Sequence, residues 1–273
     1  METLQPISLD DLKRLQLDIL SAVDAFCLRH DINYWLDCGT LLGAIRHGGY
    51  IPWDDDIDIG MLRPDYDRFM VEFNHEGGRY QFRCNELDKA FLYPSGKVLD
   101  THTVLYEPNR KGQKLAVNID VFVYDNAPAQ QRETDRLYRR RDFFRAIGRQ
   151  RVQSYRITGS CLKVLAGYLL RAVLKVFPKH FFIRRMIANS RKYMDVDTGM
   201  VGNFTSYTRI QCPKAWVEKC VRKRFEDREY NVPVGYDGWL KAFYKDYMTL
   251  PPVEKQVSHH SFEAYRLDTL PEG

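Results

Sequence analysis

The sequence lacks the marks of a secreted, disulfide-bonded or zinc-knuckle protein. None of its six cysteines forms a Cys-x-x-Cys pair, and cysteines scattered in this way favour free thiols over metal ligands or a disulfide framework. The first residues contain neither the basic segment nor the apolar segment of a secretory signal. These absences together predict a cytoplasmic protein in a reducing compartment.

Long apolar runs and a strong charge imbalance are missing as well. Residues 161–177 form the most apolar stretch, but Lys163, Arg171 and Lys175 interrupt it, so it falls short of the ~18 uninterrupted apolar residues of a spanning helix. The 41 basic and 36 acidic residues leave a net charge of +5, which is small for a nucleic-acid-binding protein of this length. We therefore expect neither a transmembrane segment nor a nucleic-acid partner.

What the chain does contain is enough apolar sequence for a sizeable core, since 44% of its 273 residues are hydrophobic and 13% are aromatic. This length is near the upper limit for one domain. We predict a single domain over residues 1–273. About residues 1–128 would form the catalytic core, and about residues 129–273 a helical and C-terminal part that completes the site.

The first fifty residues are typical of alternating helix and strand. Ser8 followed by Asp11 has the pattern of a helix N-cap, and apolar residues then recur at helical spacing. The predicted elements are a helix over residues 9–29, a strand over residues 32–36 and a short helix over residues 40–46. Paired glycines and a proline break any helix in residues 47–52, so this segment is predicted to be a loop.

An acidic stretch, Trp53-Asp54-Asp55-Asp56-Ile57-Asp58-Ile59, follows this loop. From Asp56 to Gly60, carboxylates alternate with β-branched residues, which is the period-two pattern of a strand with one polar face and one buried face. The side chains of Asp56 and Asp58 are therefore expected on the same face. A later strand over residues 117–123 alternates in the same way. Asp120 is the one carboxylate on its polar face.

Four aspartates within five residues repel one another unless their charge is compensated. Oxygen ligands on one strand face suit Mg²⁺ or Mn²⁺, and a third carboxylate on a neighbouring strand would complete a site for two ions about 3.5–4 Å apart. We therefore predict Asp56, Asp58 and Asp120 as catalytic metal ligands. A solvated acidic loop or a Ca²⁺ loop is the alternative, although the glycine and distal glutamate of an EF-hand are missing.

The rest of the chain predicts one more helix, several strands and two basic helical regions. The expected elements are a helix over residues 65–73, strands over residues 80–84, 97–99 and 104–106, and helices over about residues 129–151 and 160–189. Within the last region, residues 161–185 carry an apolar stripe with basic flanks. Such a stripe usually packs on a core, here the catalytic lobe; a peripheral position on a membrane surface is the alternative.

Gly39-Thr40 lies ahead of the acidic stretch at the expected start of a helix, where backbone N–H groups can receive a phosphate. A Gly-Thr turn, then paired carboxylates, then a single distant carboxylate is the pattern of the nucleotidyltransferase fold. We therefore predict an α+β protein. Its nucleotidyltransferase-like mixed β-sheet core would be wrapped by helices, with a helical insertion and a C-terminal extension.

The segment from Leu36 to Ile59, LDCGTLLGAIRHGGYIPWDDDIDI, resembles the signature of the LicD family, which is related to fukutin and fukutin-related protein. The run YKDYMTLPP at residues 244–252, followed by His259 and His260, also resembles the end of LicD proteins. The resemblance covers most of the chain. The basic helices of residues 129–192 carry no recognised motif.

The resemblance implies a role for individual residues. The metal ligands would be Asp54, Asp56, Asp58 and Asp120, holding two Mg²⁺ or Mn²⁺ ions. The donor's phosphates would meet Gly39, Thr40, Arg46 and Lys97, with His259 or His260 near the same pocket. Other interpretations stay open: Arg46 as a helix cap, Lys97 as a solvated lysine, and the two histidines as part of a surface tail.

LicD proteins are known for transferring phosphocholine or similar phospho-alcohols from CDP-linked donors to glycans. The resemblance thus implies metal-dependent transfer of phosphocholine to a hydroxyl of a cell-surface glycan or its lipid-linked precursor, with release of CMP. Phosphoethanolamine, ribitol phosphate and glycerol phosphate remain alternatives, as does a nucleotidyltransferase that uses a nucleoside triphosphate. A catalytically inactive binding protein would be expected to have lost a carboxylate, and all three are present. The expected location is the cytoplasm, at the inner face of the membrane if the acceptor is lipid-linked.

Overall fold

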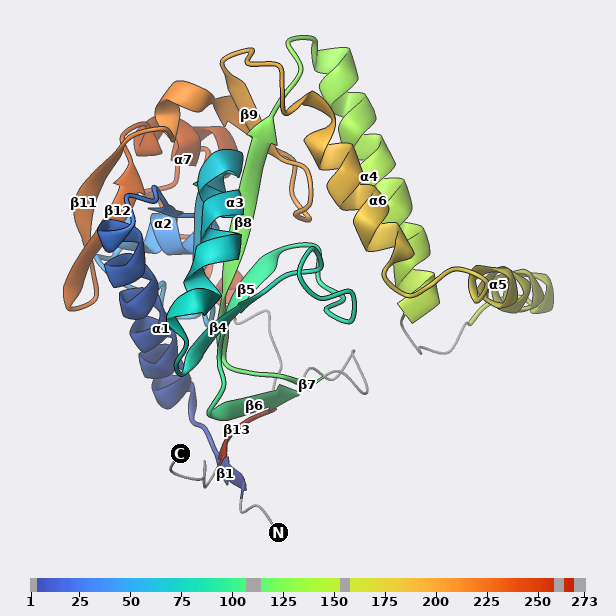
Figure 1. The fold of residues 1–273 in the computed structure, drawn as a ribbon, viewed down its shortest axis with the longest axis horizontal. Coiled ribbons are helices and arrows are strands. Elements are labelled where there is room, and N and C mark those ends of the chain that lie inside the picture. Colours follow the sequence, from blue (N-terminus) through green and yellow to red (C-terminus); the bar gives the residue numbers. More distant parts are fainter. Residues whose placement is uncertain (1–3, 107–113, 153–157, 258–262, 268–273) are drawn as a thin grey trace.

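The computed structural model describes residues 4–106, 114–152, 158–257 and 263–267 (Figure 1). Within these ranges the chain forms seven α-helices and a mixed sheet with parallel and antiparallel strands, which confirms the predicted α+β class. The helices are α1 (Leu9–Arg29), α2 (Cys38–Arg46), α3 (Arg63–Glu72), α4 (Gln131–Val152), α5 (Cys161–Leu174), α6 (Phe181–Ser190) and α7 (Tyr236–Tyr244). None of the helices in these ranges is long and apolar enough to cross a membrane.

The central sheet has seven strands and is built around its longest strand. Its members are β2 (Trp35–Leu36), β3 (Asp58–Leu62), β4 (Tyr80–Arg83), β5 (Gly96–Asp100), β8 (Asn118–Asn126), β9 (Met200–Asn203) and β10 (Ile210–Pro213). β8 pairs in parallel with β3 and antiparallel with β5 near its start, and antiparallel with β9 near its end. One strand thus connects the N-terminal half of the sheet with the strands contributed after the basic helices (Figure 1).

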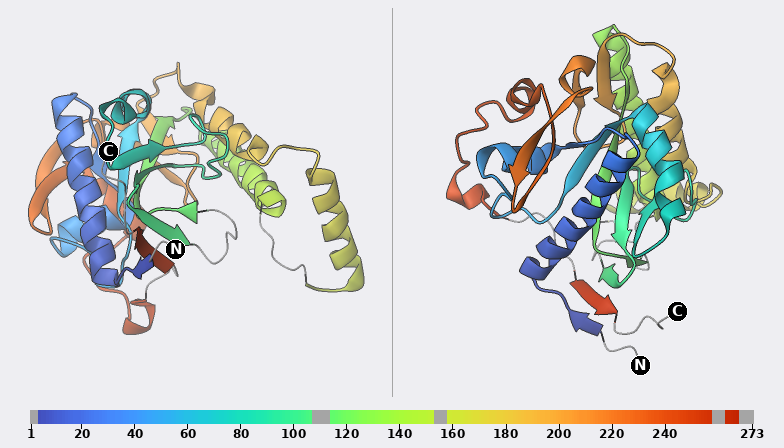
Figure 2. Two further views of the ribbon diagram at one scale, coloured as in Figure 1. Left: turned by 60° about the horizontal axis from the view of Figure 1, so that its bottom comes forward. Right: turned by 60° about the vertical axis from the view of Figure 1, so that its left-hand side comes forward.

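Two smaller sheets complete the strands. A four-stranded sheet contains β1 (Leu4–Pro6), β6 (Thr103–Tyr106), β7 (Lys114–Leu115) and β13 (Glu263–Leu267), and β11 (Cys220–Phe225) pairs with β12 (Arg228–Pro233). In the four-stranded sheet β1 pairs with β13, so the first and last strands of the chain lie side by side, as the views in Figures 1 and 2 show.

Helix α1 begins and ends at the predicted residues. The Ser8 hydroxyl accepts a hydrogen bond from the backbone N–H of Asp11 and donates one to its carboxylate, which satisfies the N-terminus of the helix. The apolar stripe, including Leu12, Ile19 and Val23, is buried against the central sheet. All six cysteines are free, as their spacing predicted.

Several predicted boundaries need correction. The strand expected over residues 32–36 is reduced to Trp35–Leu36, and the strand expected from Asp56 begins at Asp58 and runs to Leu62. Asp56 therefore precedes the strand instead of sharing its face, although the carbonyl of Ile57 already accepts from the N–H of Asp120. The strand is buried on both faces up to its last residue, as expected for a strand with a parallel neighbour.

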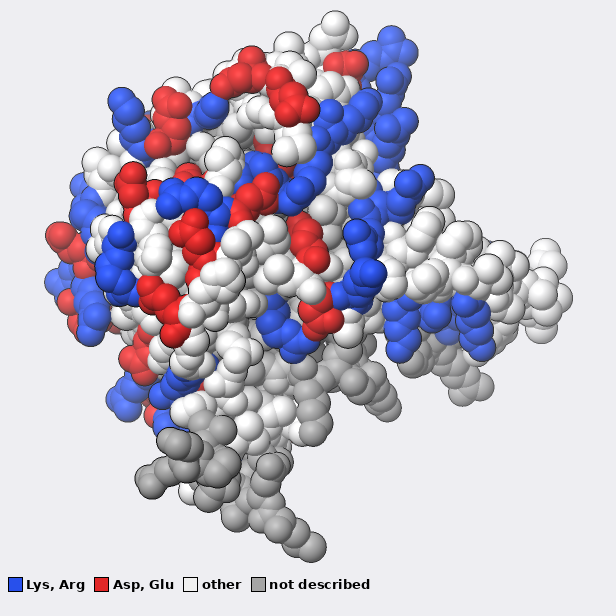
Figure 3. All heavy atoms as spheres, in the orientation of Figure 1, with Lys and Arg blue, Asp and Glu red and all other residues white. Residues whose placement is uncertain are grey.

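The helix expected over residues 160–189 is two helices, because the chain bends around Pro178, which cannot continue a helix. The expectation that the apolar stripe of the first of them packs on the catalytic lobe is wrong. Helix α5 stands away from the sheet beyond the end of α4 (Figure 1 and the left view of Figure 2), and in Figure 3 it forms a largely uncharged projection. Its Leu162 is 77% exposed and its Leu169 is 59% exposed.

Gly43 provides a test of how tightly α2 packs on the loop that leads into the acidic stretch. A Cβ at this position would lie 2.4 Å from the backbone oxygen of Gly49, so Gly43→Ala should force the two segments apart. We expect a loss of about 1–3 kcal/mol in the free energy of unfolding, the usual cost of overpacking, measured by chemical denaturation. An unchanged midpoint and slope would show that the loop can shift without cost.

Candidate active site

The parallel register of β3 and β8 places Asp58 directly opposite Asp120. Neighbouring strands lie roughly 4.8 Å apart, and paired residues point to the same face of a sheet. The two carboxylates that the sequence places more than sixty residues apart therefore face the same volume. The pairing confirms the prediction that Asp120 lies on a strand next to the acidic strand. A shared metal site for Asp58 and Asp120 requires this arrangement.

Helix α2 is fastened to the start of β3 by two hydrogen bonds. The backbone N–H of Asp58 donates to the Thr40 hydroxyl at 2.9 Å, and the N–H of Asp37 donates to the carbonyl of Asp58 at 2.9 Å. Thr40 is buried. The structure thus gives Thr40 a role in holding Asp58, whereas its predicted contact with a phosphate stays a prediction.

The N-terminus of α2 faces the acidic stretch at Gly39. A Cβ at Gly39 would lie 2.6 Å from a carboxylate oxygen of Asp54, so a larger residue here would require the Asp54 carboxylate to move away from this end of the helix. Cys38, one residue earlier, has a φ of 47°, a conformation that side chains with a Cβ rarely adopt. The partial positive charge of a helix N-terminus favours a carboxylate here.

Asp54, Asp55 and Asp56 form a compact group that precedes β3. One ligand oxygen from each lies within 4.8 Å of the others, close enough to share a metal ion. Asp55 was not among the predicted ligands, and its side chain is buried while those of Asp54 and Asp56 are partly exposed. The group of candidate metal ligands therefore also includes Asp55, which the alternation in the sequence did not suggest.

Asp58 is 9% exposed and lies among other carboxylates. Burial raises its pKa well above the usual value, and the charges of Asp56 and Asp120 raise it further, followed by those of Asp37 and Asp54. Burial also raises the pKa of Asp37 to about 6, although its carboxylate accepts hydrogen bonds from the Tyr124 hydroxyl and the N–H of Cys38. A fold that buries so many carboxylates together fits a site built for cations of hard-oxygen preference.

Lys97 lies on β5, which pairs with β8 on the side away from β3, and it is directly opposite Asp120. Its ammonium group donates to a carboxylate oxygen of Asp120 at 2.7 Å and to the side-chain oxygen of Asn118 at 3.0 Å, and the Ser95 hydroxyl donates to the other carboxylate oxygen of Asp120 at 3.1 Å. Lys97 is 7% exposed. The alternative of a solvated lysine is therefore wrong, and the amine is held at the site edge by the residue it neutralises.

Arg46 is the last residue of α2, as the helix-cap alternative expects, and one of its terminal nitrogens donates to the backbone oxygen of Tyr247 at 2.8 Å. This bond links α2 to the YKDYMTLPP segment. In the same segment Tyr244 is 40% exposed. His259 and His260 lie outside the described residues.

No motif or spacing in the sequence points directly to the residues that hold the acidic stretch in place. Gln16 on α1 donates from its side-chain amide to the carbonyl of Asp55 at 3.0 Å and accepts from the Tyr50 hydroxyl at 3.0 Å. A carboxylate oxygen of Glu226, at the β11–β12 turn, accepts from the N–H of Tyr50 at 2.8 Å. One signal was available, because Gln16 is a polar residue within the apolar stripe of α1.

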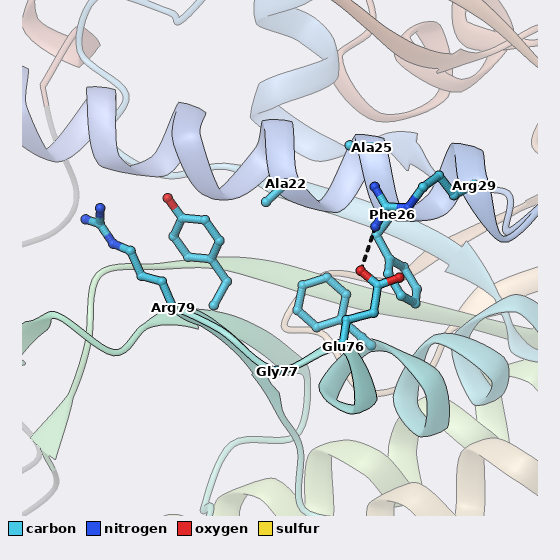
Figure 4. A pocket seen from close by; sticks show the side chains of 9 residues that line it. Ala22, Ala25, Phe26, Arg29, Glu76, Gly77 and Arg79 are labelled. Atoms are coloured by element: carbon cyan, nitrogen blue, oxygen red, sulfur yellow. Dashed lines mark hydrogen bonds and ion pairs between the residues drawn. The ribbon is translucent and has the colours of Figure 1, made fainter. Parts of the chain in front are cut away.

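A cavity of about 200 Å³ lies elsewhere, between α1 and the segment that leads into β4 (Figure 4). Phe26, Phe73 and Tyr80 line it, with Arg29 and Glu76 paired at its rim. None of the acidic-site residues lines this cavity. The cavity is therefore separate from the candidate active site.

The chain is similar in sequence to known proteins. Residues 31–147 match the family described as LicD/FKTN/FKRP, nucleotidyltransferase domain. The chain is 30% identical over 274 residues to the lipopolysaccharide cholinephosphotransferase LicD of Haemophilus influenzae, and the match covers 97% of this chain and 100% of that protein. It is also 56% identical over 34 residues to the ribitol 5-phosphate transferase FKRP of human and mouse, a match that covers 12% of this chain and 7% of FKRP.

The raised pKa of Asp58 makes a prediction about stability in the absence of divalent ions. The pKa of Asp58 is higher in the folded chain than in the unfolded chain. Its contribution to stability is therefore fully present at a pH below the pKa of the unfolded chain, and is lost as the pH rises through the pKa of the folded chain. In EDTA, Asp58→Asn should therefore exceed the wild type in free energy of unfolding by about 1–3 kcal/mol at pH 8, and by little near pH 4.

Denaturation at several pH values measures this difference, with Asp195→Asn as the control because Asp195 is exposed. Added Mg²⁺ should stabilise the wild type more than the Asp58→Asn variant. Parallel pH profiles for the wild type and Asp58→Asn would contradict the assignment of Asp58 to a repulsive carboxylate cluster.

Proposed function

Because the chain belongs to the LicD/FKTN/FKRP nucleotidyltransferase family, we propose that it transfers phosphocholine from CDP-choline to a hydroxyl of a cell-surface glycan or its lipid-linked precursor, releasing CMP. The observation that carries this proposal is the match along the whole chain to a protein named as a cholinephosphotransferase. The match to ribitol 5-phosphate transferase is confined to 34 residues. Transfer of a phospho-alcohol is what these named relatives have in common, and choline is the alcohol of the full-length one.

The carboxylates fit divalent ions by their chemistry. Asp56, Asp58 and Asp120, with Asp54 beside Gly39, offer only oxygen ligands, and a bound cation would offset the burial and the like charges that raise the pKa of Asp58. We assign two Mg²⁺ or Mn²⁺ ions to this group. Bound there, the ions supply positive charge to the phosphate oxygens of the donor and to the departing nucleotide.

The residues of the chain supply positioning and proton transfer. An oxygen of the acceptor hydroxyl attacks the phosphorus that carries the alcohol, the bond from that phosphorus to CMP breaks, and the hydroxyl proton passes to Asp120. Asp120 suits this role because its side chain is 20% exposed, whereas Asp58 is more deeply buried. Lys97 and the N-terminus of α2 at Gly39 provide positive charge for the phosphates.

The proposed setting is the cytoplasmic face of a membrane, where a lipid-linked acceptor would be reached. A nucleotidyltransferase reaction is the second candidate, because the family description names that domain. In that case a nucleoside triphosphate would be the donor and pyrophosphate the product. The two reactions release different small molecules, so they are separated by product analysis.

The reaction is tested by incubating the protein with Mg²⁺, CDP-choline and a glycan acceptor and following CMP by chromatography. CDP-ethanolamine, CDP-ribitol and CDP-glycerol run in parallel identify the preferred alcohol. We expect CMP release that EDTA abolishes, and a loss of about a hundred-fold or more for Asp56→Asn, as for removal of one electrostatic partner of a transition state. Asp195→Asn is the matched control, since it removes an exposed carboxylate outside the site.

Pyrophosphate from a triphosphate without CMP from any CDP-alcohol would replace the proposal by the nucleotidyltransferase reaction. Full activity in a protein carrying both Asp56→Ala and Asp58→Ala would remove the carboxylates from the mechanism altogether.

Lys97 gives a separate prediction because it neutralises Asp120 in the absence of donor. Lys97→Gln should lower kcat/KM for the CDP-linked donor by about 10²–10³-fold. Without Mg²⁺ it should also lower the free energy of unfolding, because Asp120 loses its partner, and Mg²⁺ should restore part of that loss. Steady-state kinetics and denaturation measure the two effects. A purely structural lysine would lower stability in both conditions and leave kcat/KM of the folded fraction unchanged.

A further inference from the structure

Helix α5 presents an apolar face that no described part of the chain covers. Leu162, Leu165, Leu169 and Val173 recur at helical spacing on α5, Val176 follows just beyond its end, and each is more than half exposed. Single exposed apolar residues are ordinary on protein surfaces, but a continuous stripe of them on one helix marks an interaction surface.

The opposite side of α5 accounts for the few contacts that hold it. Leu174 is the buried residue of the helix. Arg171 donates to the side-chain oxygen of Gln150 at 3.4 Å, and Arg151 donates to the backbone oxygen of Phe177 at 3.0 Å. The helix is thus anchored to α4 near its C-terminal end, and its apolar stripe is turned away from that anchor.

The charge around the stripe identifies the kind of partner. Residues 158–194 contain eight Lys or Arg residues and no Asp or Glu. Lys163, Lys175 and Lys179 are exposed on or beside α5. In Figure 3 the projection formed by α5 is mostly white, with Lys and Arg side chains along one edge and no Asp or Glu on the face shown. A partner that covers this surface must therefore be apolar and negatively charged at the same time.

We propose that α5 docks on an anionic lipid bilayer, lying in the plane of the headgroups with its apolar stripe inserted. A helix of 14 residues is about 21 Å long and cannot cross the ~30 Å hydrocarbon core, but it has the composition of an interfacial helix. A second copy of the chain fits less well, since pairing two such stripes brings basic flanks together without acidic partners in residues 158–194. The membrane binding stands by itself, whereas its use, bringing the site to a lipid-linked acceptor, rests on the proposed function.

The test is co-sedimentation of the full chain with vesicles of phosphatidylcholine alone or mixed with phosphatidylglycerol. We expect binding to the mixed vesicles that weakens with salt. The double variant Leu165→Gln/Leu169→Gln should bind at least about thirty-fold more weakly, because two apolar side chains no longer leave water. Lys163→Gln and Lys175→Gln should each lower binding to the mixed vesicles about five-fold.

The matched control is Leu28→Gln/Val71→Gln, which changes two apolar residues of similar exposure, 62% and 53%, on α1 and α3. This variant should bind vesicles as the wild type does. The α5 double variant should keep wild-type transfer to a water-soluble glycan acceptor, so loss of docking is distinguished from failure of the proposed reaction.

Three results would overturn the proposal. The first is no binding of the wild type to either vesicle, and the second is equal binding by the α5 double variant. The third is a wild-type dimer in solution that the α5 double variant converts to monomer without any vesicle binding, which would assign the stripe to a second copy of the chain.

Discussion

The parallel pairing of β3 with β8 is the constraint on which the rest of the site depends. It sets Asp58 against Asp120, and a shift by one residue would turn one of the two carboxylates to the other face of the sheet. Because both strands are buried behind the carboxylates, with Ile57, Ile59 and Val121 in the core, the register cannot slip without exposing apolar side chains. The same packing that stabilises the sheet therefore forces like charges together, and the fold accepts an electrostatic cost at this one edge.

The surrounding elements compensate for that cost by fixing the backbone around the acidic stretch. Thr40 holds the N–H of Asp58, Gln16 holds the carbonyl of Asp55, and Glu226 holds the N–H of Tyr50 in the preceding loop. These three residues come from α2, α1 and the β11–β12 turn. The C-terminal part of the chain thus contributes to the shape of a site whose carboxylates all lie in its N-terminal half, as the bond from Arg46 to Tyr247 also shows.

Local patterns were sufficient to predict the elements that carry the site. The N-cap at Ser8 and the spacing of the apolar residues give α1 its bounds, and alternation around Asp120 gives the burial of β8. Pairing between distant segments leaves no local pattern, so the sequence could not show that Lys97 would neutralise Asp120 or that Asp55 would join its neighbours. Alternation also predicted that Asp56 lies in the strand, whereas the chain remains irregular up to Asp58 after the loop whose Tyr50 donates to Glu226.

The error at α5 has a different physical origin. An apolar stripe predicts burial, but periodicity cannot say what does the burying, and a bilayer satisfies the stripe as well as a protein core does. The charges carry the missing information, because residues 158–194 contain eight Lys or Arg residues and no carboxylate, a composition that favours an anionic partner for the exposed helix. The carboxylates of the site gather at the starts of β3 and β8, whereas the segment that contains α5 carries only basic charges. An anionic surface attracts the basic residues around α5, so docking through this helix would hold the enzyme at the bilayer, where a lipid-linked acceptor reaches the acidic site.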